Sequence, residues 1–181
     1  AVKGDNRYHA LMGAKKCFAV CPSDTAVALA ALDAQIVMAG PEGERRIAVT
    51  EFYTPLGNSL KRGEMVTGVE VPSVAKGSKQ AFLKFTLRKP VDFAIVSVAT
   101  VIMRMNGVCK DARIALGAVA AGPVRATKAE QILVGSAVDE QAAADAAEAA
   151  LAGAKPLSMN AYKIEIAKTL VKRSILQSLV S

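Results

Sequence analysis

Two cysteines and a Ser-Asp pair occur close together near the start of the chain, in the segment CFAVCPSD. Cys17 and Cys21 are separated by three residues, a spacing that allows metal ligation, redox chemistry or simple packing. Two thiolates cannot by themselves complete a zinc site or an iron–sulfur cluster, because each of these takes about four ligands. Cys109 lies far along the sequence. Spacing alone therefore favours free thiols, buried or partly exposed, over a metal site.

The step Pro22-Ser23-Asp24 predicts the start of a helix. Ser23 or Asp24 can accept a hydrogen bond from a free N–H group of the first turn. The following residues 25–34 (TAVALAALDA) have high helix propensity. Because Ala and Leu occur on every side of this helix, we expect it to be buried against a sheet.

No self-contained catalytic motif is present in the sequence. His9 is the only histidine, and no motif around it suggests a Ser-His-Asp arrangement. The HExxH, GxGxxG and P-loop patterns do not occur. We therefore expect His9 to be a surface residue.

The composition is that of a globular protein. The 181 residues are 52% hydrophobic and only 4% aromatic, which predicts one domain, or two small ones, with a core of Ala, Val, Ile and Leu. The net charge is +7, but the basic residues are dispersed and aromatic residues are few, which argues against nucleic-acid binding. An odd count of three cysteines implies no disulfide framework and favours a reducing, cytoplasmic location. No apolar run reaches the roughly 20 residues of a membrane span, and we expect no signal peptide.

Strand-like runs and turn signals alternate in the first part of the chain. Residues 35–52 predict a hairpin that turns at Pro41-Glu42-Gly43. Residues 54–64 predict a loop, and residues 65–72 an alternating strand that ends at a proline. The connector 74–79 (VAKGSK) is the expected domain boundary.

The next part of the chain predicts a three-stranded meander. Residues 81–89 alternate between two faces, which is typical of a strand. Residues 91–105 fit helix or strand by periodicity, and because Asp92 can cap a helix we favour a helical turn that runs into a strand. Asn106-Gly107 signals a hairpin, followed by a return strand at residues 109–120.

The C-terminal part predicts helices, the last of them amphipathic with Asn160 as its cap. The expected helices cover residues 128–135, 138–154 and 160–180. The expected fold is α+β: an antiparallel sheet with covering helices in residues 1–75, then a smaller three-stranded meander packed on a helical bundle in residues 76–181.

Six segments, in this order, resemble the FAD-binding medium subunit of molybdenum hydroxylases, the enzymes of the xanthine dehydrogenase and carbon monoxide dehydrogenase type. They are GDNRYHALMG, KKCFAVCPSDTAVALAALDAQI, PEGERRI, GEMVTGVEVP, FLKFTLRKPVDFAIVSVA and AYKIEIAKTLVKRSIL. The resemblance covers essentially the whole chain. It is strongest to the branch of hydroxybenzoyl-CoA reductase and certain bacterial aldehyde oxidoreductases. It implies that residues 1–75 are part of the second FAD-binding subdomain and residues 76–181 a carbon monoxide dehydrogenase flavoprotein C-terminal-like domain.

The resemblance implies an oxidoreductase subunit that is not catalytic alone. Such a subunit passes electrons from iron–sulfur clusters through FAD to NAD or another acceptor, while the substrate reacts on another subunit. The implied partners are a large molybdopterin subunit, a small 2Fe-2S subunit and an N-terminal FAD subdomain on the same or a separate chain. The family's Gly-rich pyrophosphate loop has no counterpart here, so we expect a C-terminal part, or one polypeptide of a split subunit, with one wall of the flavin site. The alternative is a non-catalytic assembly module of the same complex without its own flavin.

The resemblance also assigns candidate flavin contacts. It implies that Asp24, with Ser23 beside it, contacts the polar chain of the flavin, that Val66 packs near the isoalloxazine, and that Lys84 lies against the ring. The ordinary roles of these residues would be helix cap, core and solvated charge, respectively.

Three further residues complete the expected site. Arg88 and Asp92 flank the turn after Lys84 and are further candidate flavin contacts. Cys17 stands where the cluster-bearing branch has its last 4Fe-4S ligand, with the other ligands on an inserted loop before Ala1. Cys21 and Cys109 have no matching ligand role, and we expect them to be packing residues.

Overall fold

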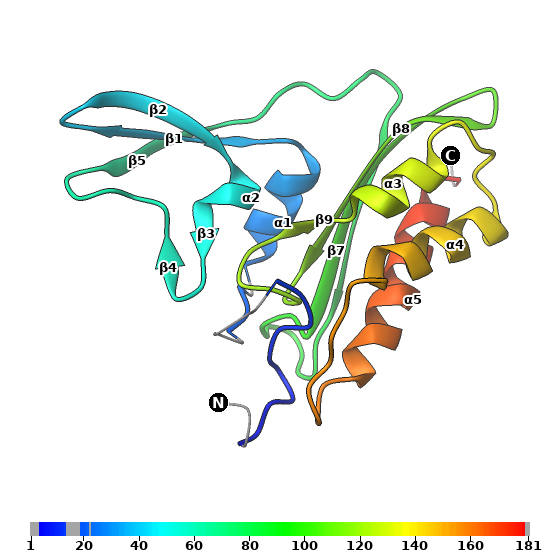
Figure 1. Ribbon diagram of the computed structural model, residues 1–181. Helices are drawn as coiled ribbons and strands as arrows, with labels where there is room; N and C mark the ends of the chain where they lie inside the picture. Colours follow the sequence, from blue (N-terminus) through cyan, green and yellow to red (C-terminus); the bar gives the residue numbers. More distant parts are fainter. Residues whose placement is uncertain (1–3, 14–18, 22, 180–181) are drawn as a thin grey trace.

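The computed structural model describes residues 4–13, 19–21 and 23–179. Its strands form a four-stranded and a three-stranded antiparallel sheet and a short two-stranded ladder, with helices on both faces of the four-stranded sheet (Figure 1). This arrangement confirms the α+β fold class expected from the sequence. In the described part of the chain, no helix is long and apolar enough to cross a membrane.

The smaller sheet has three strands in the order β2-β1-β5. Its strands are β1 (Gln35–Gly40), β2 (Gly43–Ala48) and β5 (Met65–Glu70). β1 and β2 form the expected hairpin, in which Gly40 pairs with Gly43 across the Pro41-Glu42 turn. The strand β5 was also predicted, and it pairs with the other edge of β1.

Two short elements between β2 and β5 differ from the prediction. Residues Val49–Phe52, expected to continue the hairpin, form the helical turn α2. The expected loop contains a two-residue ladder between β3 (Tyr53–Thr54) and β4 (Gly57–Asn58). Val49 is the buried residue of α2 and belongs to the core that contains Val27 and Met38.

The larger sheet is the expected meander, extended by one short strand. Its order is β6-β7-β8-β9, with β6 (Lys79–Phe85), β7 (Val96–Met105), β8 (Val108–Gly117) and β9 (Val124–Arg125). The β7–β8 turn is made by Asn106 and Gly107, both with positive φ, as the Asn-Gly pair predicts.

Helices cover the two faces of the larger sheet (Figure 1). The helix α1 (Asp24–Ala31) packs on one face, against β7 and β8. The helices α3 (Thr127–Leu133), α4 (Glu140–Leu151) and α5 (Tyr162–Gln177) lie on the other face. β7 is consequently buried on both sides: Val98 and Ile102 enter the core under α3–α5, whereas Ala99 and Val101 enter the core under α1.

The core under α1 joins residues from both sides of the expected domain boundary. Val27 of α1 and Met38 of β1 share it with Ala99 and Val101 of β7. The connector itself, residues 71–78, is irregular. The division into residues 1–75 and 76–181 stays a prediction, and two units divided there would share this core.

Two local predictions were wrong. Residues 91–95 form no helical turn, because the Asp92 carboxylate accepts hydrogen bonds from the main-chain N–H groups of Arg88 and Phe93 and so folds a tight loop. Asn160 does not cap α5, since Ala161 occupies the N-cap position without a side-chain bond. The Asn160 side chain is buried and bonds to Leu157 and to the main chain of His9 instead.

Candidate functional site

The N-terminus of α1 positions the first two candidate residues. Ser23 caps the helix, because its Oγ accepts a hydrogen bond of 3.2 Å from the main-chain N–H of Ala26. Asp24 is the first residue of the helix. Its carboxylate therefore lies at the positive end of the helix dipole, where negative charge is stabilised. The helix start predicted from Pro22-Ser23-Asp24 is confirmed, with Ser23 as the capping residue.

Lys84 and Asp24 form an ion pair between β6 and α1. Lys84 Nζ lies 2.6 Å from Asp24 Oδ2. The neighbouring residue Leu83 packs against the core on the α5 side, so the alternation of the strand directs Lys84 to the α1 side. Two residues that the sequence suggested independently are therefore in direct contact.

The second oxygen of Asp24 is left without a bond. Oδ1 is sheltered from solvent and has no hydrogen-bond partner among the described residues. An ionised carboxylate accepts through both oxygens, and a sheltered acceptor without a donor is costly. Among the described residues, the pair therefore leaves one carboxylate oxygen without a donor, next to an ammonium group.

A glycine allows α1 to approach the sheet closely enough to form this site. A Cβ built on Gly117 of β8 would lie 2.3 Å from Val27 Cγ2 and 2.3 Å from Ser97 Oγ. Both contacts are much shorter than van der Waals distances, so any side chain at this position would push the helix outward. Gly117 thus sets the height of α1, and of Asp24, above the sheet.

Tyr53 is a neighbour of the site that the sequence did not indicate. Its side chain lies near Ser23 and Cys21. Burial raises the pKa of the Tyr53 phenol, Cys21 adds to this effect and the Ser23 side chain opposes it. Its position depends on the helical turn α2, which was not predicted, so no local signal in the sequence pointed to Tyr53.

Val66 is not brought to the Asp24–Lys84 pair. It lies on β5 in the smaller sheet, opposite Met38 of β1, and is 40% exposed. In Figure 1 the smaller sheet extends away from the end of α1 that carries Asp24. The expected role of Val66 as a flavin contact stays a prediction.

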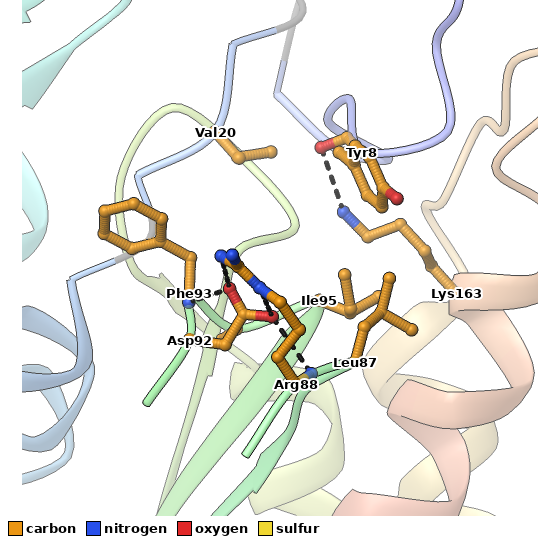
Figure 2. Close-up of a pocket in the computed structure, with 9 residues that line it drawn as sticks. Tyr8, Val20, Leu87, Arg88, Asp92, Phe93, Ile95 and Lys163 are labelled. Carbon is orange, nitrogen blue, oxygen red and sulfur yellow. Dashed lines mark hydrogen bonds and ion pairs between the residues drawn. The ribbon is translucent and has the colours of Figure 1, made fainter. Parts of the chain in front are cut away.

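Arg88 and Asp92 lie in a different place, at the mouth of a cavity of about 490 Å³ (Figure 2). Arg88 Nη2 lies 2.8 Å from Asp92 Oδ1. This guanidinium, together with the N–H groups of Phe93 and Arg88, holds the pKa of Asp92 down at about 2. The two side chains are thus bonded to each other, and the bonds of Asp92 to the main chain hold the loop between β6 and β7 in place.

The same cavity contains a buried lysine that the sequence analysis did not single out. Lys163 of α5 and Tyr8 line it together with the Arg88–Asp92 pair (Figure 2). Burial lowers the pKa of Lys163 to about 8. In the sequence Lys163 is one of several lysines on an amphipathic helix, so only the tertiary structure distinguishes it.

The two cysteines that the structure describes lie in different settings. Cys17 lies outside the described residues. Cys109 is fully buried, and burial raises the pKa of its thiol, while Cys21 is a partly exposed free thiol. Within the described ranges, no group of three or more His, Cys, Asp or Glu side chains could hold a metal ion.

Two family models match the chain in sequence. Residues 7–74 match the FAD binding domain in molybdopterin dehydrogenase, and residues 81–178 match the CO dehydrogenase flavoprotein C-terminal domain. The chain belongs to the family of FAD-binding medium subunits of molybdenum hydroxylases. The resemblance noted in the sequence is thereby confirmed.

Individual members of this family are similar over most of the chain. The aldehyde oxidoreductase FAD-binding subunit PaoB of Escherichia coli (strain K12) is 35% identical over 176 residues, which are 93% of this chain and 52% of that protein. The carbon monoxide dehydrogenase medium chain of Afipia carboxidovorans is 29% identical over 93% of this chain and 60% of that protein. This medium-subunit chain thus spans between about half and three fifths of the length of these relatives.

Solved structures of the family have the same fold. A carbon monoxide dehydrogenase from Hydrogenophaga pseudoflava, which lacks the Mo-pyranopterin moiety of the molybdenum cofactor, superimposes with a TM-score of 0.81 at 31% identity. It covers 87% of this chain, and this chain covers 56% of it. The fold described above is therefore the fold of family members in this class of oxidoreductase.

Proposed function

We propose that this medium-subunit chain forms one wall of the flavin site, with Asp24 and Lys84 directed at FAD. The observation that carries the proposal is the free Oδ1 of Asp24, a sheltered acceptor beside the Lys84 ammonium. The flavin group supplies the redox chemistry when it is bound. The chain's own residues bind and orient it.

Asp24 and Lys84 would act on different parts of the cofactor. Asp24 Oδ1 would accept a hydrogen bond from a hydroxyl of the ribityl chain, because the N-terminus of a helix stabilises negative charge and a carboxylate is a strong acceptor. Lys84 would place a positive charge near the ring and favour negative charge there. Ser23 would hold the first turn of α1 in place through its cap.

The remaining candidate residues have supporting roles in this proposal. The Arg88–Asp92 pair fixes the loop that follows β6, and so fixes the C-terminal end of the strand that carries Lys84. Val66 lies on the smaller sheet, so any contact that it makes with the flavin ring would come from that sheet. A 4Fe-4S cluster at Cys17 would require ligands other than the described residues.

The wider role follows from the family and is part of the proposal. Electrons would reach the flavin from a large molybdopterin subunit through a small 2Fe-2S subunit, and would leave to NAD or another acceptor. The relatives' names support a place in such assemblies, since they are described as FAD-binding subunits and medium chains. The substrate would react on the large subunit.

The test is FAD affinity of the full-length subunit in its complex, with Asp24→Asn as the variant. A hydrogen bond to a charged group contributes about 1.5–3 kcal/mol, so we expect the Kd for FAD to rise about 10- to 100-fold. The control is Asp145→Asn on α4, whose exposed side chain bonds only to Gln141. An unchanged Kd in Asp24→Asn would overturn the proposed contact, and a wild-type complex that binds no FAD would favour the assembly module without its own flavin.

A further inference from the structure

Lys163 is a buried cation whose partners, within the part of the chain that the structure describes, are all main-chain carbonyl groups. The residue is 1% exposed, and its Nζ donates to Ala118 O at 2.6 Å, to His9 O at 3.1 Å and to Tyr8 O at 3.4 Å. Figure 2 shows the side chain reaching from α5 toward the main chain of Tyr8. An ammonium group has three N–H donors, so the three carbonyls match its full bonding capacity. No carboxylate of the described residues lies within 4.0 Å of it, the ion-pair distance.

The shortest of these bonds reaches a strained residue. Ala118 has φ of 60°, a left-handed conformation that costs a residue with a Cβ roughly 1–2 kcal/mol. It is buried just after β8. Such a conformation persists only where its surroundings enforce it, and the Lys163 ammonium is one of those constraints.

Three segments meet at the turn 118–120. On one side, the N–H groups of Leu11 and Met12 both donate to Val119 O, at 2.7 Å and 3.0 Å. On another side, Cys21 N donates to Ala120 O at 2.9 Å, and Ala118 N donates to Cys21 O at 3.3 Å. Lys163 holds the turn from the third side, through Ala118 O.

The turn 118–120 leads directly to the flavin-facing end of α1. Two main-chain hydrogen bonds join Cys21 to this turn. Cys21 lies two residues before Ser23, which caps the helix. The position of Cys21 therefore constrains where Ser23 and Asp24 begin the helix. Hydrogen bonds thus link Lys163 to Ala118 and Ala118 to Cys21, which lies three residues before Asp24 in the sequence.

We propose that Lys163 is a positioning residue of the flavin site, acting through the turn 118–120 on Asp24. It touches neither Asp24 nor Lys84, and its effect on FAD binding is indirect. The proposal rests on the proposed function, because it assumes that Asp24 faces FAD. The family comparisons and the sequence motifs assign no such role to this lysine.

The experiment is a double-mutant cycle on FAD affinity, in the full-length subunit within its complex. Lys163→Met should raise the Kd for FAD about tenfold, because the turn is released and Asp24 loses its fixed position. The matched control is Lys172→Met on the same helix, whose ammonium pairs with the exposed Glu140 at the surface. This control should change the Kd less than twofold.

The cycle separates positioning from general stabilisation. In an Asp24→Asn background, Lys163→Met should add less than twofold, because residues that act through one another are not additive. If Lys163 only stabilised the fold, the increases in Kd for FAD of the two single variants would multiply in the double variant. If Lys163→Met does not fold, Lys163→Gln, which keeps two N–H donors without a charge, replaces it in the same cycle.

Two different failures can be distinguished. A Kd that is unchanged in Asp24→Asn itself would overturn the proposed function, and this inference with it. The other failure requires that Asp24→Asn raises the Kd for FAD as expected. If the Kd is then unchanged in the Lys163 variant, or if the two increases in Kd multiply fully in the double variant, only the role of Lys163 is overturned.

Discussion

Lys84 and Asp24, 60 residues apart in sequence, meet at 2.6 Å where β6 passes the N-terminus of α1. Only one carboxylate oxygen of Asp24 takes part, and Oδ1 stays unbonded among the described residues. An ion pair formed only for stability gains little at a half-exposed site. Under the proposed function, this arrangement would offer FAD a preorganised acceptor and a cation.

Replacing Lys84 by Met should lower the midpoint potential of the bound flavin. Loss of the cation removes stabilisation of negative charge on the ring, and it also leaves the Asp24 charge unpaired nearby. A change of 1.4 kcal/mol corresponds to about 30 mV for a two-electron couple, and we expect a fall of about this size. Lys79→Met, at the exposed start of the same strand, should leave the potential unchanged. Spectroelectrochemical titration measures both, and an unchanged potential in Lys84→Met would contradict the role of this lysine.

Replacing Gly117 by Ala should destabilise the fold and weaken FAD binding together. The new Cβ would clash with Val27 and Ser97, and overpacking of this kind typically costs 1–3 kcal/mol, so we expect about that loss of unfolding free energy. Urea denaturation and FAD titration measure the two effects. Gly153→Ala is the control, because its Cβ would meet only Met12 Cε at 4.0 Å. Equal stabilities of the two variants would show that α1 does not depend on this close approach.

Replacing Ser23 by Ala should destabilise α1 by removing its cap. Loss of an N-cap hydroxyl costs about 0.5–2 kcal/mol, and the Ala26 N–H would lose its acceptor. We expect a matching fall in the free energy of unfolding by urea, with Ser73→Ala in the exposed connector as the control. A variant as stable as the wild type would mean that the cap contributes nothing to the helix.

The Arg45–Glu64 pair should give the protein an acid-sensitive component of stability. Bonds from the Arg45 guanidinium and the Lys61 N–H lower the pKa of Glu64 from its usual value to about 2. Since the folded pKa lies below the unfolded one, the contribution is present above about pH 4.5 and is lost as the pH falls toward 2. Glu64→Gln should reduce the change of the urea midpoint with pH over this window. Glu42→Gln, at an exposed carboxylate, should leave this pH dependence unchanged. A wild-type midpoint that stays constant between pH 5 and pH 3 would refute this contribution.

The sequence predicted those parts of the fold that local patterns determine. The Asn106-Gly107 turn, the Ser23 helix start and the alternation around Lys84 each follow from a few adjacent residues, and all three are confirmed. The cap expected at Asn160 was wrong because that residue has a distant partner. Asn160 resembles a cap in sequence, but its buried side chain is used to hold the main chain of His9, some 150 residues away.

In the candidate site, too, local sequence patterns predicted some features, whereas others depend on residues far apart in the sequence. Periodicity placed Lys84 on one face of its strand, but only the packing of α1 on the larger sheet shows that this face meets Asp24. Tyr53 and Lys163 could not be identified from the sequence, because they are distinguished by burial and by contacts with groups that are remote in the sequence. Arg88 and Asp92, close to Lys84 in sequence, lie instead at a separate cavity with Lys163.

The most direct test is an experimental structure of the complete complex with FAD bound. We predict Asp24 Oδ1 within hydrogen-bonding distance of a ribityl hydroxyl, about 2.5–3.0 Å, and the Lys84 ammonium beside the flavin ring. Both side chains lying well away from the bound FAD would contradict the central claim that this chain supplies a wall of the flavin site.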